Sequence, residues 1–348
     1  MNRILFLYSE IAQYFITCLQ ALVENYDIEV HLVKWEKNAE APFEFEIDSR
    51  IKLYERSDYN NEELLNLAKS INPALIFSVG WMDKGYVKVC KSYKSKIPVV
   101  FGMDNKWNGG LKQQVATLIS PFTIQTYFSH AWVAGVPQKK YAEKLGFRNK
   151  HVLEGYYSAD VDYFSKFYLE KSAQDTFPKR FIYVGRYIPH KGISGLCEAF
   201  IALQKEAPNN WELWGLGTGE LEGNLPKHSQ IKHFGFVQPK DMNSYISQTS
   251  VMVLPSHYEP WGVVVHEFAT AGFPLICSRE VGASTAFLKE NKNGFLFNAK
   301  NTDELKACLK KIVKMDHGSL KEMSIKSHEL GNQITPKKWA STLMALLG

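Results

Sequence analysis

The stretch VMVLPSHYEPWGVVVHEFATAGFPLIC, residues 251–277, runs through an apolar segment, a polar loop, a helical pattern and a second apolar segment. Val251–Leu254 and Leu275–Cys277 have the length and composition of buried strands. A strand, a helix and a strand in succession form the βαβ unit, which is typical of parallel sheets. This stretch therefore predicts an α/β fold.

Two glutamates lie eight positions apart within this stretch. Glu259 falls in the loop after the first strand, and Glu267 falls inside a helix that we expect to begin near Trp261 or Gly262. Loops at the carboxyl ends of parallel strands are where open α/β sheets bind ligands. A helix that begins there also aims free backbone N–H groups at any anion. We therefore expect the two carboxylates to hold a hydroxylated ligand.

Paired glutamates on a helix more often form a solvated face, and this helix argues against that interpretation. Apolar residues occupy almost all of its other positions: Val263, Val264, Val265, Phe268, Ala269 and Ala271. Such a helix has almost no polar face, so a carboxylate on it calls for a functional explanation.

Short apolar runs alternate with helical patterns along the whole chain. In the first half the predicted strands are Ile4–Tyr8, Glu29–Val33, Leu75–Val79, Pro98–Phe101, Ala131–Val133 and a segment near His151–Leu153, with helices over Ile11–Asn25 and Glu62–Ser70. In the second half they are Arg180–Val184, Trp211–Trp214, Ile231–Phe234, Val251–Leu254, Leu275–Cys277 and Gly294–Phe297. The pattern predicts two doubly wound, Rossmann-like domains that face one another across a cleft.

The domain boundaries follow from composition. Residues 1–165 form the first domain, and the polar, charged segment 166–179 reads as a linker. Residues 180–332 form the second domain. Residues 333–348 form an amphipathic terminal helix that carries Trp339, Leu343 and Leu346.

The 348-residue chain is long enough for two domains, each with its own core. No apolar run approaches the roughly 20 residues that span a bilayer, and the short apolar start of the chain reads as a first strand rather than a signal peptide. The five cysteines are scattered without paired spacing. We therefore expect a reduced, cytoplasmic protein without disulfides or zinc.

The net charge of +5 is unevenly distributed. Residues 24–63 carry twelve acidic and five basic residues, whereas residues 84–150 carry twelve basic residues against two acidic ones, with aromatics between them. A basic, aromatic face suits peripheral contact with an anionic membrane, although a solvated surface of mixed use explains it as well. Nucleic-acid binding is not expected, because the chain has no recognised module or dense basic stripe.

The paired glutamates resemble the E-x7-E motif of the retaining family-4 glycosyltransferases, within the glycosyl transferases group 1, which adopt the GT-B fold. Three further elements stand in the order of that family. Gly185–Gly192 resembles its G-R-x(n)-K-G turn, Trp214–Leu221 its glycine-rich turn, and Phe234–Gln238 the segment whose backbone holds the base. The resemblance covers residues 180–300 well and the first domain poorly.

The resemblance implies a site for a nucleotide-sugar donor in the second domain. Arg186 and Lys191 would neutralise the leaving diphosphate, Glu259 would bind the transferred sugar, and Glu267 would chelate the ribose diol. The other donor-binding positions that it implies are Gly185, Gly217, Val237, Gln238, Pro260, Trp261, Gly262, Val263 and Gly282. His257 is a further candidate sugar contact.

The resemblance assigns acceptor binding to the first domain and packs the terminal helix on it. Here the pattern departs from the family. The turn after the first strand contains Glu10 but no glycine, and the segment after Pro98–Phe101 contains no histidine. We expect Asp104 to take the catalytic place on this side, although a simple capped turn explains this segment as well. Glu10, Asn105, Trp107 and His130 are acceptor-side candidates.

The implied reaction is a retaining, metal-independent transfer of a sugar, from a UDP-sugar by default, to a glycan or lipid-linked acceptor, as in cell-surface polysaccharide biosynthesis. No metal or cofactor is expected. The chain has one D-x-D sequence, Asp160-Val161-Asp162, and a metal-binding D-x-D belongs to a different fold class of glycosyltransferases. Here it falls in a segment that resembles the family's G-V-D-x-x-x-F turn. Four alternatives stay open: an inverting GT-B enzyme with Asp104 as base, a nucleotide-sugar epimerase, a non-catalytic nucleotide-sugar-binding protein and an NAD-dependent oxidoreductase.

Overall fold

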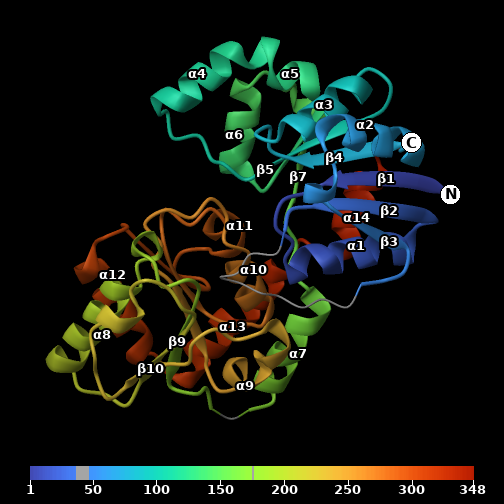
Figure 1. Ribbon diagram of the computed structural model, residues 1–348. Coiled ribbons are helices and arrows are strands. Elements are labelled where there is room, and N and C mark those ends of the chain that lie inside the picture. Colours follow the sequence, from blue (N-terminus) through green and yellow to red (C-terminus); the bar gives the residue numbers. More distant parts are fainter. Residues whose placement is uncertain (37–46, 175) are drawn as a thin grey trace. The chain divides into compact units, whose positions relative to one another are not determined.

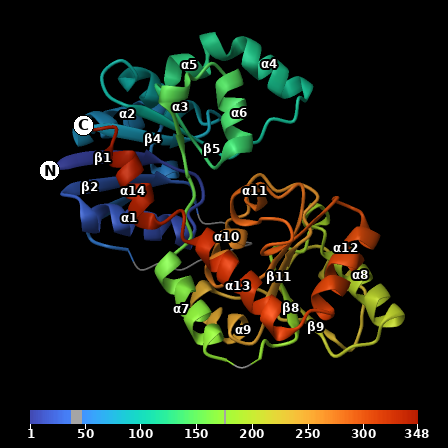
Figure 2. The same ribbon diagram turned by 180° about the vertical axis from the view of Figure 1, so that it is seen from behind.

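The computed structural model describes residues 1–36, 47–174 and 176–348. The chain divides into two compact units: residues 1–158 with 334–348, and residues 159–333. We call them unit 1 and unit 2. Each is an α/β layer structure around one sheet, and Figures 1 and 2 show both from opposite sides.

Unit 1 is built on a seven-stranded parallel sheet in the order β3-β2-β1-β4-β5-β6-β7. Its strands are β1 (Asn2–Leu7), β2 (Ile28–Lys34), β3 (Ile51–Glu55), β4 (Leu75–Val79), β5 (Val99–Met103), β6 (His130–Val133) and β7 (Val152–Glu154). The sequence pattern predicts all of these strands except β3. Among the described strands β3 lies at the edge of the sheet beside β2, and of its five residues Ile51 alone is buried, so it lacks the apolar run of a central strand.

The helices of unit 1 cover both faces of this sheet. They are α1 (Gln13–Asn25), α2 (Asn61–Ile71), α3 (Lys84–Tyr93), α4 (Leu111–Ile119), α5 (Ile124–Tyr127), α6 (Val136–Lys144) and α14 (Pro336–Met344). Alternate residues of β1 enter different cores: Leu5 and Leu7 pack with α2, α3 and α6, whereas Ile4 and Phe6 pack with α1 and α14.

The terminal helix α14 belongs to unit 1. Trp339 is 1% exposed, and its ring lies 4.8 Å from that of Trp132. Its indole N–H donates to the carbonyl oxygen of Tyr156 over 2.7 Å. The last residues of the chain therefore complete the core that α1 begins.

Unit 2 is built on a six-stranded parallel sheet in the order β10-β9-β8-β11-β12-β13. Its strands are β8 (Arg180–Val184), β9 (Glu212–Leu216), β10 (Ile231–His233), β11 (Val251–Leu254), β12 (Leu275–Ser278) and β13 (Gly294–Phe297). All six agree with the sequence pattern to within a few residues. The sheet has a topological switch point between β8 and β11, because β8 leads to β9 on one side and has β11 on the other.

The helices of unit 2 are α7 (Val161–Ser172), α8 (Ile193–Glu206), α9 (Asn243–Ile246), α10 (Val263–Thr270), α11 (Ser284–Phe287), α12 (Thr302–Val313) and α13 (His317–Gly331). The first half of the segment 166–179, expected to be a linker, lies within α7, and the two units divide after residue 158 rather than 165. The charged residues concealed an apolar stripe, since Val161, Phe164 and Phe167 are buried. Asp160 caps this helix by accepting from the Tyr163 N–H.

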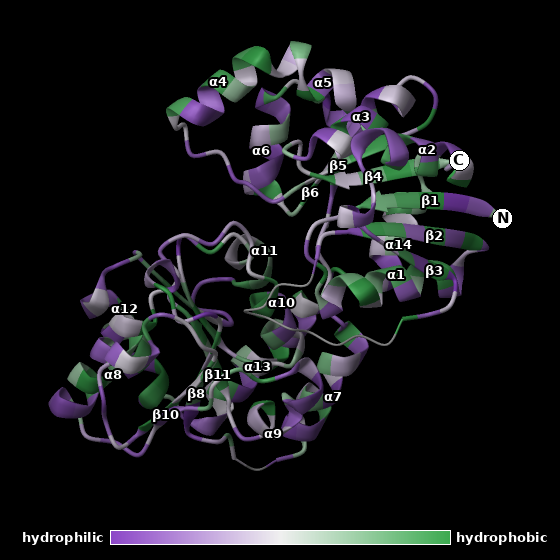
Figure 3. Ribbon diagram, viewed as in Figure 1, coloured by the Kyte–Doolittle hydropathy of each residue, from purple (hydrophilic) through white to green (hydrophobic). Residues whose placement is uncertain are grey.

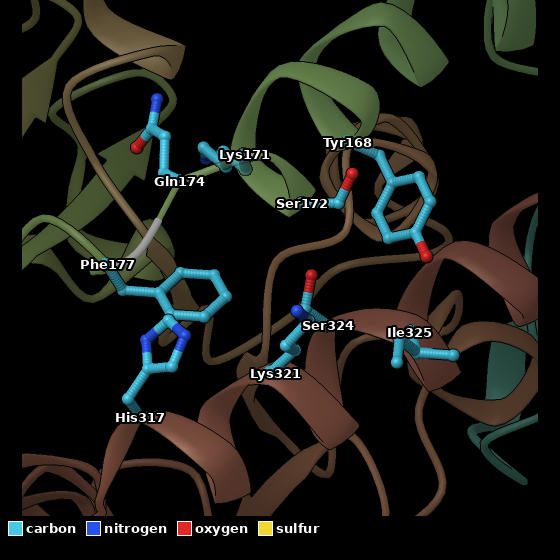
Figure 4. Close-up of a pocket in the computed structure, with 9 residues that line it drawn as sticks. All are labelled: Tyr168, Lys171, Ser172, Gln174, Phe177, His317, Lys321, Ser324 and Ile325. Atoms are coloured by element: carbon cyan, nitrogen blue, oxygen red, sulfur yellow. The ribbon is translucent and has the colours of Figure 1, made fainter.

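Lys171, on the last turn of α7, is a buried amine. It is 3% exposed, and among the described residues its Nζ has no hydrogen-bond partner. The Nζ atom lies 3.0 Å from the ring centre of Phe273, and burial lowers the pKa of Lys171 well below its ordinary value. It borders a small pocket between α7 and α13, together with His317 and Lys321 (Figure 4).

Replacing this amine with an apolar side chain of similar length should stabilise the protein. Because burial lowers the pKa of Lys171, the folded protein binds the Lys171 proton more weakly than the unfolded chain does, so this group weakens folding below its ordinary pKa. We expect Lys171→Met to raise the free energy of unfolding by about 2 kcal/mol at pH 7. The gain should shrink toward pH 10, where the unfolded amine also loses its proton.

Denaturant titrations at both pH values measure this effect. Lys321→Met, at an exposed position bordering the same pocket, is the matched control and should change stability by less than about 0.5 kcal/mol. A destabilised Lys171→Met protein would show that the amine has a stabilising partner.

Candidate functional site

The candidate site lies at the switch point of the unit 2 sheet. Strands β8 and β11 run parallel and pair in the register Phe181 to Val251. The loops at their carboxyl ends, residues 185–192 and 255–262, are therefore neighbours. Open α/β sheets bind ligands in the crevice at such a switch point.

Gly192 allows these two loops to approach one another. Its φ of 74° lies in the left-handed region, and a Cβ atom there would stand 2.3 Å from the carbonyl oxygen of Pro255. Only glycine satisfies both conditions. The backbone N–H of His257 also donates to the carbonyl oxygen of His190 over 2.7 Å, which ties the loops together.

The close approach brings Lys191 against Glu259. The Nζ of Lys191 donates to Oε2 of Glu259 over 2.5 Å, and their side chains are 18% and 11% exposed. The Ser256 hydroxyl is a more distant partner of the same oxygen, at 3.4 Å. Two residues that lie 68 positions apart in the sequence thus form one largely buried ion pair at the switch point.

The loop after β12 is joined to the Glu259 loop through the backbone. The Gly282 N–H donates to the carbonyl oxygen of Glu259 over 3.1 Å, and the Ala283 N–H donates to that of Trp261 over 2.8 Å. Pro260 lies between these two acceptors. These two hydrogen bonds place Gly282 beside Glu259.

Gly262 and Val263 form the beginning of α10. Gly262 has a φ of 92°, which again favours glycine, and Val263 is the first helical residue. This bend turns the chain from the Glu259 loop into the helix that carries Glu267. The expected helix start near Trp261 or Gly262 agrees with the structure to within two residues.

Glu267 lies one and a half turns into α10 and is partly buried. Loss of hydration and, second, the charge of Asp160 raise the pKa of Glu267 to about 7. Carboxyl groups whose pKa is raised toward neutral pH in this way are frequent at binding and catalytic positions.

The glycine-rich turn after β9 packs directly on the turn after β8. Gly217 has a φ of 147°, and a Cβ atom there would meet the carbonyl oxygen of Gly185 at 1.9 Å. The Gly217 N–H donates to the carbonyl oxygen of Gly235 over 2.7 Å. The three turns after β8, β9 and β10 therefore form one layer, and Val237 and Gln238 follow directly after Gly235.

Arg186 and His257 border this layer. Arg186 is exposed, and its carbonyl oxygen accepts from the Tyr183 hydroxyl over 2.9 Å. His257 is partly buried, and burial, followed by the charges of Lys300 and His190, lowers its pKa.

In unit 1, Asp104 follows β5 at the carboxyl edge of the sheet. The Tyr157 hydroxyl donates to Oδ2 of Asp104 over 3.2 Å, and the Gln138 amide donates to the carbonyl oxygen of Asp104 over 3.0 Å. Sequence reasoning missed Tyr157, because an aromatic residue after the last strand of a domain gives no signal of its own. Glu10 is exposed and follows β1 at the same edge.

The other acceptor-side candidates of unit 1 differ in how near they lie to Asp104. Asn105 is exposed beside it. Trp107 packs at 5.5 Å on the ring of Tyr141, and the Lys144 amine lies 4.8 Å from the centre of the Trp107 ring. His130 begins β6 and pairs with Val100, so it lies near the amino ends of the strands, away from Asp104. The structure does not bring His130 together with the other acceptor-side candidates.

A clustered metal-ligand set is not found in the described ranges: no group of three or more His, Cys, Asp and Glu side chains there could hold a metal ion. The helices of those ranges also lack the combination of length and apolar character that a bilayer crossing requires.

Fold and site together define a two-unit α/β protein in which glycine turns and an ion pair lie side by side at the switch point of one sheet. Residues 164–330 match the family model described as glycosyl transferases group 1. The matched range contains the whole unit 2 site, from Gly185 to Gly282.

Curated relatives match over about a third of the chain. An uncharacterized glycosyltransferase of Methanocaldococcus jannaschii, MJ1607, is 29% identical over 134 residues, which is 36% of this chain and 34% of that protein. The glycogen synthase of Mycobacterium tuberculosis is 33% identical over 119 residues, 32% of this chain and 29% of that protein. The chain thus spans about a third of the length of these relatives.

Solved structures match over the full length. HepE from Anabaena, in complex with UDP and glucose, has a TM-score of 0.70 at 14% identity and covers 99% of both chains. The sucrose-phosphate synthase of Thermosynechococcus elongatus has a TM-score of 0.74 at 16% identity, over 99% of this chain and 98% of that one. At such identities the likeness shows the fold, which confirms the expected pair of Rossmann-like domains. Together with the family match it supports an enzyme of the glycosyltransferase type.

The raised pKa of Glu267 makes stability depend on pH. Between the ordinary value of 4.5 and about 7, the unfolded chain ionises this group while the folded protein keeps it protonated, so stability falls as pH rises through this window. We expect Glu267→Gln to lack this loss. Its free energy of unfolding relative to wild type should rise by on the order of 2 kcal/mol from pH 4.5 to pH 7.5.

Denaturant titrations at several pH values measure the difference. Glu322→Gln, at an exposed position on α13, is the matched control and should follow the wild-type pH dependence. A constant difference between Glu267→Gln and wild type across this window would contradict the environment assigned to Glu267.

Proposed function

We propose that the protein is a glycosyltransferase that moves a sugar from a nucleotide-sugar donor, by default a UDP-sugar, to an acceptor hydroxyl. The observation that carries this proposal is the Lys191–Glu259 pair at the switch point of unit 2. This pair places a cation that can bind a diphosphate at hydrogen-bond distance from a carboxylate that can bind sugar hydroxyls. The family match over residues 164–330 and the UDP complex of the structurally similar HepE support it.

The roles follow from chemistry and position. Lys191 and Arg186 would neutralise the diphosphate, and the backbone N–H groups at the start of α10 would add positive potential. Glu259 would accept hydrogen bonds from the transferred sugar. Glu267 would hold the ribose diol, since a carboxylate can accept from two hydroxyls. Gly185, Gly217, Val237, Gln238 and Gly282 would surround the nucleotide with backbone.

In the free protein, Lys191 and Glu259 satisfy one another. A bound donor would replace each partner: the diphosphate would take Lys191, and a sugar hydroxyl would take Glu259. The ion pair would thus keep both side chains in place before the donor arrives. Such preorganisation reduces the reorganisation that transition-state stabilisation requires.

We further propose that the reaction is retaining and independent of metal. The bond from the anomeric carbon to the diphosphate breaks while the bond to the acceptor oxygen forms on the same face. The acceptor proton passes to the departing phosphate oxygen. Lys191, Arg186 and the N-terminus of α10 supply the positive charge that this departure requires.

Asp104 supports a second candidate, an inverting transfer. It lies at the carboxyl edge of the unit 1 sheet and is held by the Tyr157 hydroxyl, so it could serve as a general base. The anomeric configuration of the product, read by NMR, distinguishes the two: retention supports the first candidate and inversion supports Asp104.

For the acceptor we propose a glycan or lipid-linked hydroxyl, recognised by unit 1, in cell-surface polysaccharide biosynthesis. One relative with 30% identity over 105 residues is the O-antigen chain mannosyltransferase B of Escherichia coli. The basic segment 84–150 supports peripheral contact with an anionic membrane at its cytoplasmic face.

Loss of the Lys191 amine should slow transfer much more than it weakens donor binding. We expect Lys191→Ala to lower kcat about 100-fold or more, equivalent to roughly 3 kcal/mol of transition-state stabilisation, with donor affinity changed less than tenfold. Steady-state kinetics of donor hydrolysis or transfer, with calorimetric titration of the donor, separates the two quantities.

Lys205→Ala, at an exposed position on α8, is the matched control and should leave both quantities unchanged. Equal losses of affinity and turnover in Lys191→Ala would indicate plain ground-state charge pairing. Donor binding without transfer or hydrolysis by the wild type would indicate a non-catalytic binding protein.

A further inference from the structure

Helix α4 and the turn that follows it, η2 (Ser120–Phe122), expose a stripe of large apolar side chains. Leu111 is 80% exposed, Val115 54%, Leu118 75% and Phe122 81%. Within α4 these positions follow the spacing i, i+4 and i+7, which places them on one face of the helix. Figure 3 shows this hydrophobic character along α4. We call these four residues the α4 stripe.

The stripe reverses the usual orientation of a surface helix. The residues that α4 and η2 bury are small: Ala116 is 5% exposed and Ser120 is fully buried. The Ser120 hydroxyl donates to the carbonyl oxygen of Leu145 over 2.6 Å, which holds this face against the end of α6. An amphipathic helix of a globular protein normally turns its large apolar residues toward the core. Here they point outward, which marks an interaction surface.

The surroundings of the stripe carry positive charge. Between Asp104 and Glu143 the sequence contains no acidic residue. Lys112 is exposed on α4 itself. On α6, whose end contacts Ser120, Lys140 and Lys144 are exposed together with one acid, Glu143, so the exposed charge that these helices carry is positive on balance. Arg148 is exposed four residues after Lys144. A partner that fits this surface must combine an apolar layer with negative charge.

We propose that the α4 stripe inserts into the interfacial layer of an anionic lipid bilayer, with the basic residues of α4 and α6 contacting the headgroups. An amphipathic helix that lies in the plane of the interface buries its apolar face among the acyl chains, and nearby basic side chains add electrostatic attraction. The observed exposures and charges match both requirements. A second copy of this chain fits less well, because two such faces would oppose like charges.

This proposal deepens the membrane contact named in the proposed function by assigning it to specific residues. It does not depend on sugar transfer, because vesicle binding is measured without donor or acceptor. Failure of either proposal is therefore distinguishable from failure of the other.

The test is co-sedimentation of the full chain with vesicles of phosphatidylcholine alone and of phosphatidylcholine with 30% phosphatidylglycerol. The double variant Leu118→Gln/Phe122→Gln removes the two most protruding side chains of the last turn of the stripe. Leu169→Gln/Ile325→Gln is the matched control, with exposed apolar residues of unit 2, 63% and 49% exposed. Thermal unfolding verifies that all variants are folded.

We expect wild type and control to bind the anionic vesicles, more weakly at high salt, and the stripe variant to partition roughly tenfold less or worse. Binding of the stripe variant equal to wild type would overturn the proposal, as would a wild type that binds neither vesicle. A wild-type dimer in light scattering that the stripe variant abolishes, with no vesicle binding, would assign the stripe to a second copy instead.

Discussion

The site depends on one topological constraint: β8 has β9 on one side and β11 on the other. After β8 the chain continues to β9 on one side, and it returns later as β11 on the other side of β8. The loops after β8 and β11 therefore lead away from each other, and no connecting segment lies between them. Because Gly192 has no side chain, the loop after β8 can pack directly against the Pro255 carbonyl group of the loop after β11. The Lys191–Glu259 pair is the result. Without that strand order, the two side chains would have no reason to meet.

Much of the fold could be predicted from apolar runs alone. Arg180–Val184, Val251–Leu254, Leu75–Val79 and Gly294–Phe297 are strands with the predicted bounds, because strands buried on both faces are continuously apolar. The sequence pattern missed β3 and α7 because neither shows a continuous apolar run. β3 is an edge strand with few buried residues, and α7 carries enough charge to resemble a linker while its buried side chains pack in unit 2.

The candidate site could be predicted only in part. The spacing of Glu259 and Glu267 indicated two carboxylates near one crevice, and the structure places both around the same loop and helix. Spacing could not reveal that Lys191 pairs with Glu259, because the contact depends on three-dimensional approach. Nor could it reveal that burial beside Asp160 raises the pKa of Glu267. In unit 1, His130 resembled an acceptor-side group in sequence but begins its strand, whereas Asp104 follows one. Because the strands are parallel, a residue that begins a strand lies at the opposite end of the sheet from a residue that follows one.

The most direct test of the switch-point site is calorimetric titration of the protein with UDP, GDP, ADP and NAD, each with and without a chelator. The prediction is that one nucleoside diphosphate, UDP by default, binds at one site per chain, indifferently to chelator. Its affinity should fall in Glu267→Ala, where the ribose would lose its carboxylate. If no nucleoside diphosphate binds, if only NAD binds, or if Glu267→Ala binds as wild type does, the assignment of the switch-point site to a nucleotide-sugar donor is wrong.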